Sequence, residues 1–208
     1  MKKIAIIFII TLIQTFSFGQ TKHKLFYDNG NIKEIGQFNK NEERAGEWIS
    51  YFENGNVSSK GKFYNGKPEG EFSAYYENGN LKEVGKFTES GSKVGDWKEY
   101  HENGKLNNTG NYSNEKRNGE WKYYYESGEL EIIEYFVDGK LDGDFKYFYK
   151  NGELQAISKF DKGERTGEWR YYYETGRLKV VGNYLNGKQS GEWKIYDELG
   201  KIIKTENY

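Results

Sequence analysis

The feature that most constrains the fold of this chain is an internal repeat with a period of 24 or 25 residues. Each unit contains a turn that ends in glycine, then an aliphatic residue and a closing aromatic ring. Units of this length are supersecondary elements that bury a core only by stacking on their neighbours. The repeat predicts one domain of seven to eight units over residues 21–208, marked by Gly-Glu/Asp-Trp/Phe at Gly46, Gly70, Gly95, Gly119, Gly143, Gly167 and Gly191.

Each unit has the composition of a β-hairpin. Residues 119–126 read GEWKYYYE, and such aromatic runs favour a pleated strand. The pair Asn-Gly that follows in most units predicts a two-residue type I′ turn, because both turn residues need a positive φ. A second strand and a looser link then lead to the next unit. The expected fold class is all-β: an elongated, single-layer antiparallel sheet of successive hairpins.

The turn also predicts a register. If Asn54-Gly55 is a two-residue turn, Trp48 lies opposite Gly61, and Gly46 lies opposite Phe63. Each large ring is then expected to cover a bare glycine across the ladder. Three units replace the glycine that faces the Trp or Phe position, and there we expect a displaced ring or a looser hairpin: Glu134, Ser158 and Glu206. The hairpin of Trp121, which faces Glu134, is predicted to be the loosest.

In this register, one face carries the Trp/Phe positions, the Leu positions and the closing rings. The middle ring of each aromatic triplet falls on the opposite, more polar face, unless a β-bulge moves it to the apolar side. Two interpretations of this row remain open: a surface that binds a partner, or rings that only cover the second face of a thin sheet. The candidate binding residues are Tyr51, Tyr75, Tyr100, Tyr124, Tyr172 and Tyr196, with Phe148 in the same row.

Composition argues against several function classes. Lys and Arg total 31 against 32 Asp and Glu, so there is no basic excess to attract nucleic acid. The absence of cysteine excludes thiol catalysis, Cys-ligated zinc and an acyl-cysteine anchor. His23 and His101 occupy positions where other units carry a ring, and the acidic residue of Gly-Glu-Trp recurs in every unit, which is not typical of a catalytic pair. We expect no catalytic residue, metal or cofactor, and therefore no enzyme.

The first twenty residues differ from the rest. Lys2 and Lys3 precede an apolar run, Ile4–Ile13, and small and polar residues follow. This layout is typical of a secretory signal peptide, and the run is shorter than the ~20 residues that cross a bilayer. We expect residues 1–20 to be removed and the protein to be periplasmic or secreted, without a lipid anchor or a membrane span. An uncleaved anchor is the other interpretation.

Taken together, the repeated segments resemble a known family. Residues 162–188, KGERTGEWRYYYETGRLKVVGNYLNGK, resemble MORN repeats, most closely the variant in bacterial proteins grouped as YwqK-type antitoxins. The resemblance implies hairpins stacked into one twisted sheet. It also implies an antitoxin or immunity role, whereas MORN repeats more broadly imply scaffolding and contacts with lipids or proteins.

The resulting hypothesis is a non-enzymatic, exported scaffold that binds another protein, with an antitoxin that binds a cognate toxin as its specific form. The alternative is a module that binds envelope glycans or lipid surfaces through the repeated aromatic row. Open edge strands also suggest a homo-oligomer. No nucleic-acid partner is expected.

Overall fold

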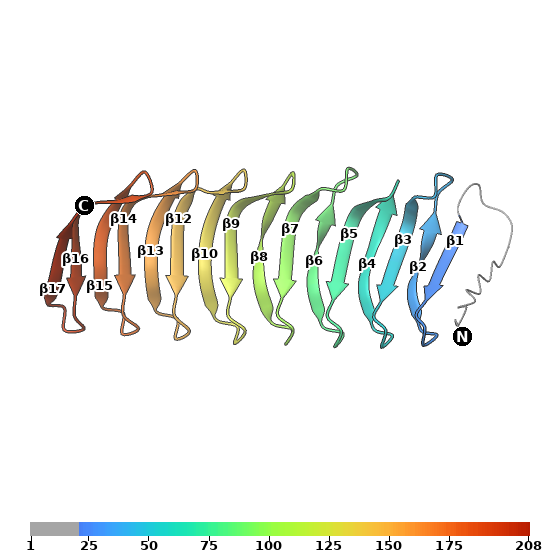
Figure 1. Ribbon diagram of the computed structural model, residues 1–208, viewed down its shortest axis with the longest axis horizontal. Coiled ribbons are helices and arrows are strands. Elements are labelled where there is room, and N and C mark those ends of the chain that lie inside the picture. The colour runs from blue at the N-terminus through green and yellow to red at the C-terminus, as the bar shows by residue number, and fades with distance from the viewer. Residues whose placement is uncertain (1–20) are drawn as a thin grey trace, which may run out of the picture.

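The computed structural model describes residues 21–208, and the expected signal peptide lies outside them. The described residues form one antiparallel sheet of 17 strands (Figure 1). The part of the chain described contains no helix that is long and apolar enough to cross a membrane. The strands are β1 (Thr21–Phe26), β2 (Ile32–Phe38), β3 (Arg44–Tyr51), β4 (Val57–Tyr64), β5 (Lys67–Tyr75), β6 (Leu81–Phe87), β7 (Lys93–Tyr100), β8 (Leu106–Ser113), β9 (Lys116–Tyr124), β10 (Leu130–Val137), β11 (Lys140–Leu141), β12 (Gly143–Phe148), β13 (Leu154–Asp161), β14 (Glu164–Tyr172), β15 (Leu178–Leu185), β16 (Lys188–Tyr196) and β17 (Ile202–Asn207).

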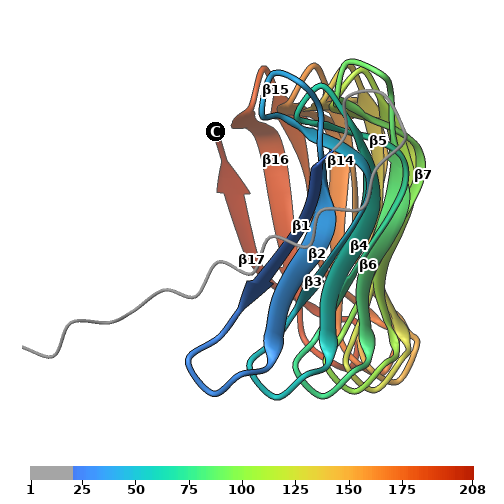
Figure 2. The ribbon, with the colours of Figure 1, turned by 90° about the vertical axis from the view of Figure 1, so that its right-hand side faces the viewer.

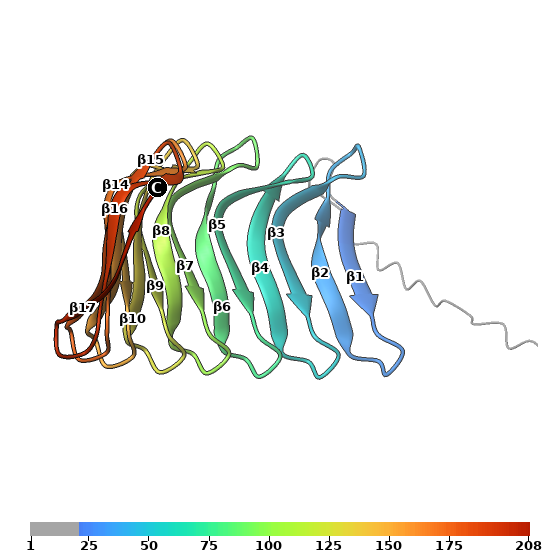
Figure 3. The same ribbon diagram turned by 60° about the vertical axis from the view of Figure 1, so that its left-hand side comes forward.

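The strands follow one another in chain order from β1 to β17, and each pairs with the next, except that β10 pairs with both the short β11 and β12. The glycine-ending turns line one rim of the sheet and the links line the other (Figure 1). Viewed along its long axis, the sheet is bowed (Figure 2), and a rotated view shows that it also twists from one end to the other (Figure 3). Successive strands twist because each has a right-handed twist of its own. The predicted fold class is confirmed.

The predicted register is confirmed as well. Trp48 pairs with Gly61, and Gly46 pairs with Phe63. The same pairing recurs along the sheet, for example between Trp169 and Gly182.

The predicted turn, however, is wrong. The amide of Phe52 donates to the carbonyl of Asn56 at 2.7 Å, and the amide of Gly55 donates to the carbonyl of Phe52 at 2.9 Å. Gly55 has φ 91°, whereas Asn54 is not among the residues with positive φ. The loop therefore contains three residues with glycine alone in the left-handed position, rather than a type I′ pair. Asparagine is used for its side chain: the Oδ1 of Asn54 accepts the amide of Asn56 at 2.9 Å.

A β-bulge compensates for the longer turn. Tyr51 pairs with Val57, but Ser50 pairs with Ser59, so Ser58 is an extra residue in β4. The bulge restores the register that a two-residue turn would have produced. It also changes the faces, because the aliphatic position now pairs with the middle tyrosine. The prediction that the Leu positions share the tryptophan face is wrong, since they form cross-strand pairs with the tyrosine row.

The core consists of tryptophans packed on glycines, but on different glycines from those predicted. A Cβ built on Gly36 would lie 2.2 Å from Cδ2 of Trp48, so the indole lies directly over the preceding hairpin. Trp48 is 2% exposed, and its Nε1 donates to the carbonyl of Gln37 at 3.0 Å. Each such ring joins two hairpins. The same close approach recurs for Trp97 on Gly85, Trp121 on Gly110 and Trp193 on Gly182.

The glycine of Gly-Glu-Trp has another role. A Cβ on Gly119 would meet nothing within 4 Å, so this glycine is not a floor beneath Phe136. Its φ is 74°, a left-handed conformation that L side chains rarely adopt. The glycine is required by the backbone, which makes an irregular step here against the preceding strand.

The replaced glycines act on the following hairpin. Trp121 faces Glu134 but is 1% exposed, so its hairpin is not the loosest. Ser158, by contrast, lies beneath the ring position of the next unit, and Trp169 there is only half-buried. The ring lies instead 5.6 Å from Trp193, centroid to centroid. Displacement of a ring was correctly expected, but it occurs one hairpin later than predicted.

Candidate functional site

The candidate tyrosines form one row on the face opposite the tryptophans. Each is half-buried. Their hydroxyls make no hydrogen bond within residues 21–208, whereas the hydroxyl of Tyr125 does. Each ring pairs with an aliphatic residue, which produces a continuous aromatic and aliphatic stripe. These pairs are Tyr51 with Val57, Tyr75 with Leu81, Tyr100 with Leu106, Tyr124 with Leu130, Tyr172 with Leu178 and Tyr196 with Ile202, with Phe148 and Leu154 in the same row. We call it the Tyr–Leu stripe.

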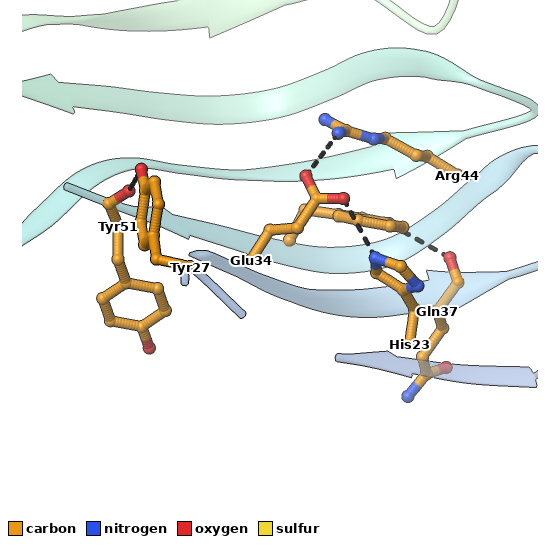
Figure 4. Close-up of polar contacts among 7 residues, drawn as sticks. His23, Tyr27, Glu34, Gln37, Arg44 and Tyr51 are labelled. Atoms are coloured by element: carbon orange, nitrogen blue, oxygen red, sulfur yellow. Dashed lines mark hydrogen bonds and ion pairs between the residues drawn. The ribbon is translucent and has the colours of Figure 1, made fainter. Parts of the chain in front are cut away.

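The third ring of each triplet has a structural role that the sequence analysis missed. The hydroxyl of Tyr27 donates to the carbonyl of Tyr51 at 2.8 Å (Figure 4). His101 occupies the equivalent position, and its Nε2 lies 2.8 Å from the carbonyl of Tyr124. Each of these bonds joins one hairpin to the next, and recurrence of a ring at the repeat period was the available signal. The remaining bonds are Tyr76 to Tyr100, Tyr125 to Phe148, Tyr149 to Tyr172 and Tyr173 to Tyr196.

Burial raises the pKa of Tyr76, Tyr125 and Tyr149, all third rings. The neutral hydroxyl is the form that can donate to a carbonyl. The structural bonds therefore persist throughout the ordinary pH range.

Asparagines tie the turns together along one rim. The Nδ2 of Asn54 donates to the carbonyl of Glu77 at 3.0 Å, and Asn78 donates in the same way to Glu102. This ladder changes at Ser127, where no asparagine is present and Lys105 Nζ donates to the Ser127 carbonyl at 2.6 Å. Beside this break lies an open hollow of about 480 Å³, lined by Lys105, Leu106, Tyr124, Ser127, Gly128 and Glu129.

Ion pairs flank the Tyr–Leu stripe. The carboxylate of Glu120 lies 2.7 Å from Lys122 Nζ on the same strand. This lysine, together with a hydrogen bond from Tyr135, holds the pKa of Glu120 below its usual range. Equivalent pairs recur between Glu168 and Arg170 and between Glu192 and Lys194. Most of the repeated carboxylates are thus partners of neighbouring cations.

Cations also cover the tryptophan face. The guanidinium of Arg44 lies 4.2 Å from the ring centre of Trp48, and Arg117 lies 4.4 Å from that of Trp121. Such contacts contribute roughly 0.5–2 kcal/mol, depending on desolvation. The cations close the tryptophan core on its outer side.

His23 occupies the tryptophan position of the first hairpin. Its ring centre is 5.1 Å from that of Phe38 and 5.4 Å from that of Trp48. Its Nε2 lies 2.9 Å from Glu34, which also accepts a bond from Arg44 at 2.8 Å (Figure 4). This arrangement caps the ring stack. Residues 21–208 contain no group of three His, Cys, Asp or Glu side chains that could hold a metal ion.

Comparison with solved structures returns large toxin assemblies at low similarity. The chain is 14% identical to one titled "Crystal Structure of TcdB2-TccC3-Cdc42", with a TM-score of 0.24. The match covers 85% of this chain and 11% of that one. Against the Photorhabdus luminescens Tc holotoxin pore, the identity is 13% and the TM-score is 0.21, and the match covers 91% of this chain and 13% of that one. The chain thus spans about a tenth of the length of these structures. Among curated proteins, none matches.

The repeat itself is matched directly. The family described as "MORN repeat variant" matches eight successive segments: 21–40, 44–65, 68–89, 93–114, 117–138, 141–162, 165–186 and 189–208. Each segment spans most of one hairpin and its turn. Because these segments cover most of the chain, the protein belongs to the MORN repeat variant family, whose repeats suggest a scaffold or binding role.

Proposed function

We propose that this protein is a non-enzymatic scaffold that binds an extended segment of a partner protein along the Tyr–Leu stripe. One observation carries the proposal. Within residues 21–208 the hydroxyls of the middle tyrosines make no hydrogen bond, whereas those of third rings such as Tyr27 and Tyr125 join one hairpin to the next. Tyrosine is among the residues most enriched at binding hot spots, since it offers a large ring and a polar tip.

The spacing of the row matches an extended chain. Successive tyrosines lie on every second strand, so the rings recur about every 9–10 Å along the sheet. A peptide in extended conformation advances by about 3.3 Å per residue and would meet a tyrosine at about every third residue. The flanking ion pairs, such as Glu120 with Lys122, supply a polar rim around the stripe.

Two sequence features support a more specific role, that of an exported immunity protein. Residues 1–20 have the layout of a signal peptide, which supports an exported, periplasmic or secreted protein without a lipid anchor. The resemblance to YwqK-type antitoxins supports an immunity component whose partner is a cognate toxin. The even charge balance supports a partner other than nucleic acid.

The hollow beside Tyr124 favours a second candidate function. There an aromatic ring stands next to the ammonium of Lys105 and the carboxylate of Glu129. A sugar ring can stack on tyrosine while its hydroxyls bond both charges. An envelope glycan is therefore the alternative ligand.

A double variant tests both candidates. Tyr124→Ala with Tyr172→Ala removes two rings of the row, whereas Tyr64→Ala removes a tyrosine that is 58% exposed and lies outside it. We expect the parent and the Tyr64 variant to capture the same partner from an envelope fraction, and the double variant to lose it. Binding of the parent to a glycan panel, without capture of a protein partner, would favour the alternative ligand. If the double variant keeps its β circular dichroism and binds everything that the parent binds, the proposal is wrong.

A further inference from the structure

We propose that copies of this protein join end to end, with β17 of one copy pairing with β1 of the next, so that the sheet continues across the contact. The proposal uses the two edges of the sheet rather than the Tyr–Leu stripe, so it does not depend on the proposed function. It deepens the expectation of an edge-strand oligomer by assigning partner strands and a register.

The first and last described strands are in phase with the repeat. β1 is a first strand of a hairpin, since it places His23 opposite Gly36, and β17 is a second strand, since it places Glu206 opposite Trp193. β1 of a second copy would therefore supply the type of strand that follows a strand like β17 in the repeat. The two strands also run in opposite directions (Figure 1), so their contact would be antiparallel like every other pair in the sheet.

The outer edge of β17 presents unpaired backbone groups. Gly191 and Tyr208 exchange two backbone hydrogen bonds, of 3.0 and 3.1 Å. Because bonded residues alternate in an antiparallel ladder, Thr205 and Asn207 turn their amides and carbonyls away from β16. No strand within residues 21–208 pairs with that side of β17 or with the outer side of β1. Such edges are templates for pairing with another chain.

The repeat specifies the register of the contact. In the last link, Val180 pairs with Ile195 and Val181 pairs with Lys194. One repeat further along, the equivalent pairs join Lys204 to Leu25 of the second copy and Thr205 to its Lys24. Glu206 is then equivalent to Gly182, which has no Cα partner in the link and lies beneath the Trp193 ring, so Glu206 comes close to the ring of the second copy's His23.

Side chains at the two ends are compatible in this register. The carboxylate of Glu206, which also contacts Lys204, comes close to the imidazole of His23, whose Nε2 contacts Glu34. The edge lysines Lys24 and Lys204 do not face each other, which avoids like-charge repulsion. Lys201 occupies the position from which Lys105 donates to the Ser127 carbonyl and Arg177 to the Glu198 carbonyl. It is the equivalent donor for the first turn of the next copy.

Both ends also expose apolar side chains that interior units half-bury. Phe26 in β1 is 50% exposed and Ile202 in β17 is 47% exposed, whereas their interior equivalents Tyr172 and Leu178 are half-buried. A head-to-tail contact that does not close on itself generates an open filament. The expected assemblies are therefore chains of increasing length rather than a closed dimer.

Cysteine cross-linking tests the register directly, because the chain has no cysteine of its own. Thr205→Cys combined with Lys24→Cys places two thiols in a predicted backbone-bonded pair, about 5.5 Å apart between Cα atoms, which a disulfide can span. In the full chain under mild oxidation, we expect a ladder of dimers, trimers and larger species. Each single variant can form dimers only. Thr205→Cys with Lys22→Cys, out of register by two residues, is expected to cross-link at least fivefold more slowly; equal yields from the two pairs, or no species beyond dimers, would overturn the proposal.

Backbone pairing has its own test. Thr205→Pro deletes an outward amide and leaves the bonds to β16 intact, whereas Thr205→Ala keeps the amide. In sedimentation velocity, the average mass of the parent and of the Ala variant should rise with concentration, while the Pro variant remains monomeric. A parent that stays monomeric at every concentration, or a Pro variant that associates like the parent, contradicts the proposal.

Discussion

Trp121 and Trp169 occupy equivalent positions but differ in the residue on the preceding strand, Gly110 for Trp121 and Ser158 for Trp169. They also differ in the residue opposite on the following strand, Glu134 for Trp121 and Gly182 for Trp169. Trp121 lies over Gly110, is 1% exposed and donates from Nε1 to the carbonyl of Asn111 at 3.2 Å. It makes edge contacts with a closing ring on each side, Tyr112 and Phe136. Trp121 therefore joins the hairpin before it to its own.

Trp169 meets Ser158 in place of that glycine. Its ring is half-buried and is stacked on Tyr171 at 5.8 Å. The hydroxyl of Ser158 is buried without a partner among the described residues. The β14–β15 register is nevertheless the same as in the other hairpins. The comparison shows that backbone pairing and ring packing are separable here, because the ring position differs while the ladder is the same.

Removal of the two rings should give the largest contrast. Trp121→Ala empties a filled core position and is expected to lower the free energy of unfolding by about 3–5 kcal/mol. Trp169→Ala removes a ring that is less buried than Trp121 and should cost about half as much, because less apolar area leaves water on folding. Urea unfolding followed by circular dichroism measures both, and equal losses would contradict the comparison.

Addition of a single methyl group should convert the first environment toward the second. A Cβ on Gly110 would lie 2.2 Å from Trp121, so Gly110→Ala is expected to cost about 1–3 kcal/mol through overpacking. Gly61→Ala is the matched control, since its Cβ would meet Phe72 at 3.0 Å. The control should lose less stability than Gly110→Ala in the same thermal unfolding assay.

The reverse change should repair the second environment. A buried hydroxyl without a partner destabilises the fold by about 1–3 kcal/mol, and Ser158→Gly removes this cost. The new glycine within a strand costs about 0.5–1 kcal/mol. We expect a net gain of about 1 kcal/mol and a Trp169 ring that moves onto the sheet. Because the other tryptophans are buried, acrylamide quenching reports mainly on Trp169 and should decrease. Unchanged quenching would mean that Ser158 does not displace the ring.

The two tyrosine rows should also respond differently. Tyr125→Phe removes the bond to the Phe148 carbonyl and is expected to cost about 1 kcal/mol. Tyr124→Phe removes a hydroxyl that has no partner among the described residues and should leave stability unchanged. Phe52, which occupies a third-ring position naturally, shows that the fold tolerates one missing bond. Equal effects of the two substitutions would indicate that the middle row is structural too.

The smallest expected effect concerns Glu134, which faces Trp121. Burial raises its pKa, while Tyr123 and Arg117 oppose that shift. For an acid whose folded pKa is raised, stability is full below the unfolded pKa and is lost as pH rises through the folded pKa. Glu134→Gln should therefore be slightly more stable than the parent at neutral pH, and the difference should vanish below the usual carboxyl range. A difference independent of pH would exclude ionisation as its cause.

Much of this molecule was predictable from local patterns. The period, the hairpin fold and the register of Trp48 on Gly61 all follow from spacings along the chain, because a stacked repeat forces equivalent residues into equivalent places. The row of middle tyrosines was also predicted to lie on the face opposite Trp48, and it does. The predicted register is correct although the predicted turn is wrong, because the bulge at Ser58 adds one residue to β4 and compensates for the longer turn.

Other features needed the tertiary structure. Pairing within a hairpin is a local property, but the glycine under each indole belongs to the preceding hairpin. Ring direction across the link cannot be read from Cα register alone, since a strand has neighbours on both sides. Likewise, only the packed sheet separates third rings such as Tyr125, whose hydroxyls join hairpins, from middle rings such as Tyr124, whose hydroxyls stay unbonded within residues 21–208. Local patterns in the sequence therefore specify the repeat, the strands and their order, whereas the contacts between hairpins decide which ring hydroxyls are bonded within residues 21–208 and which are not.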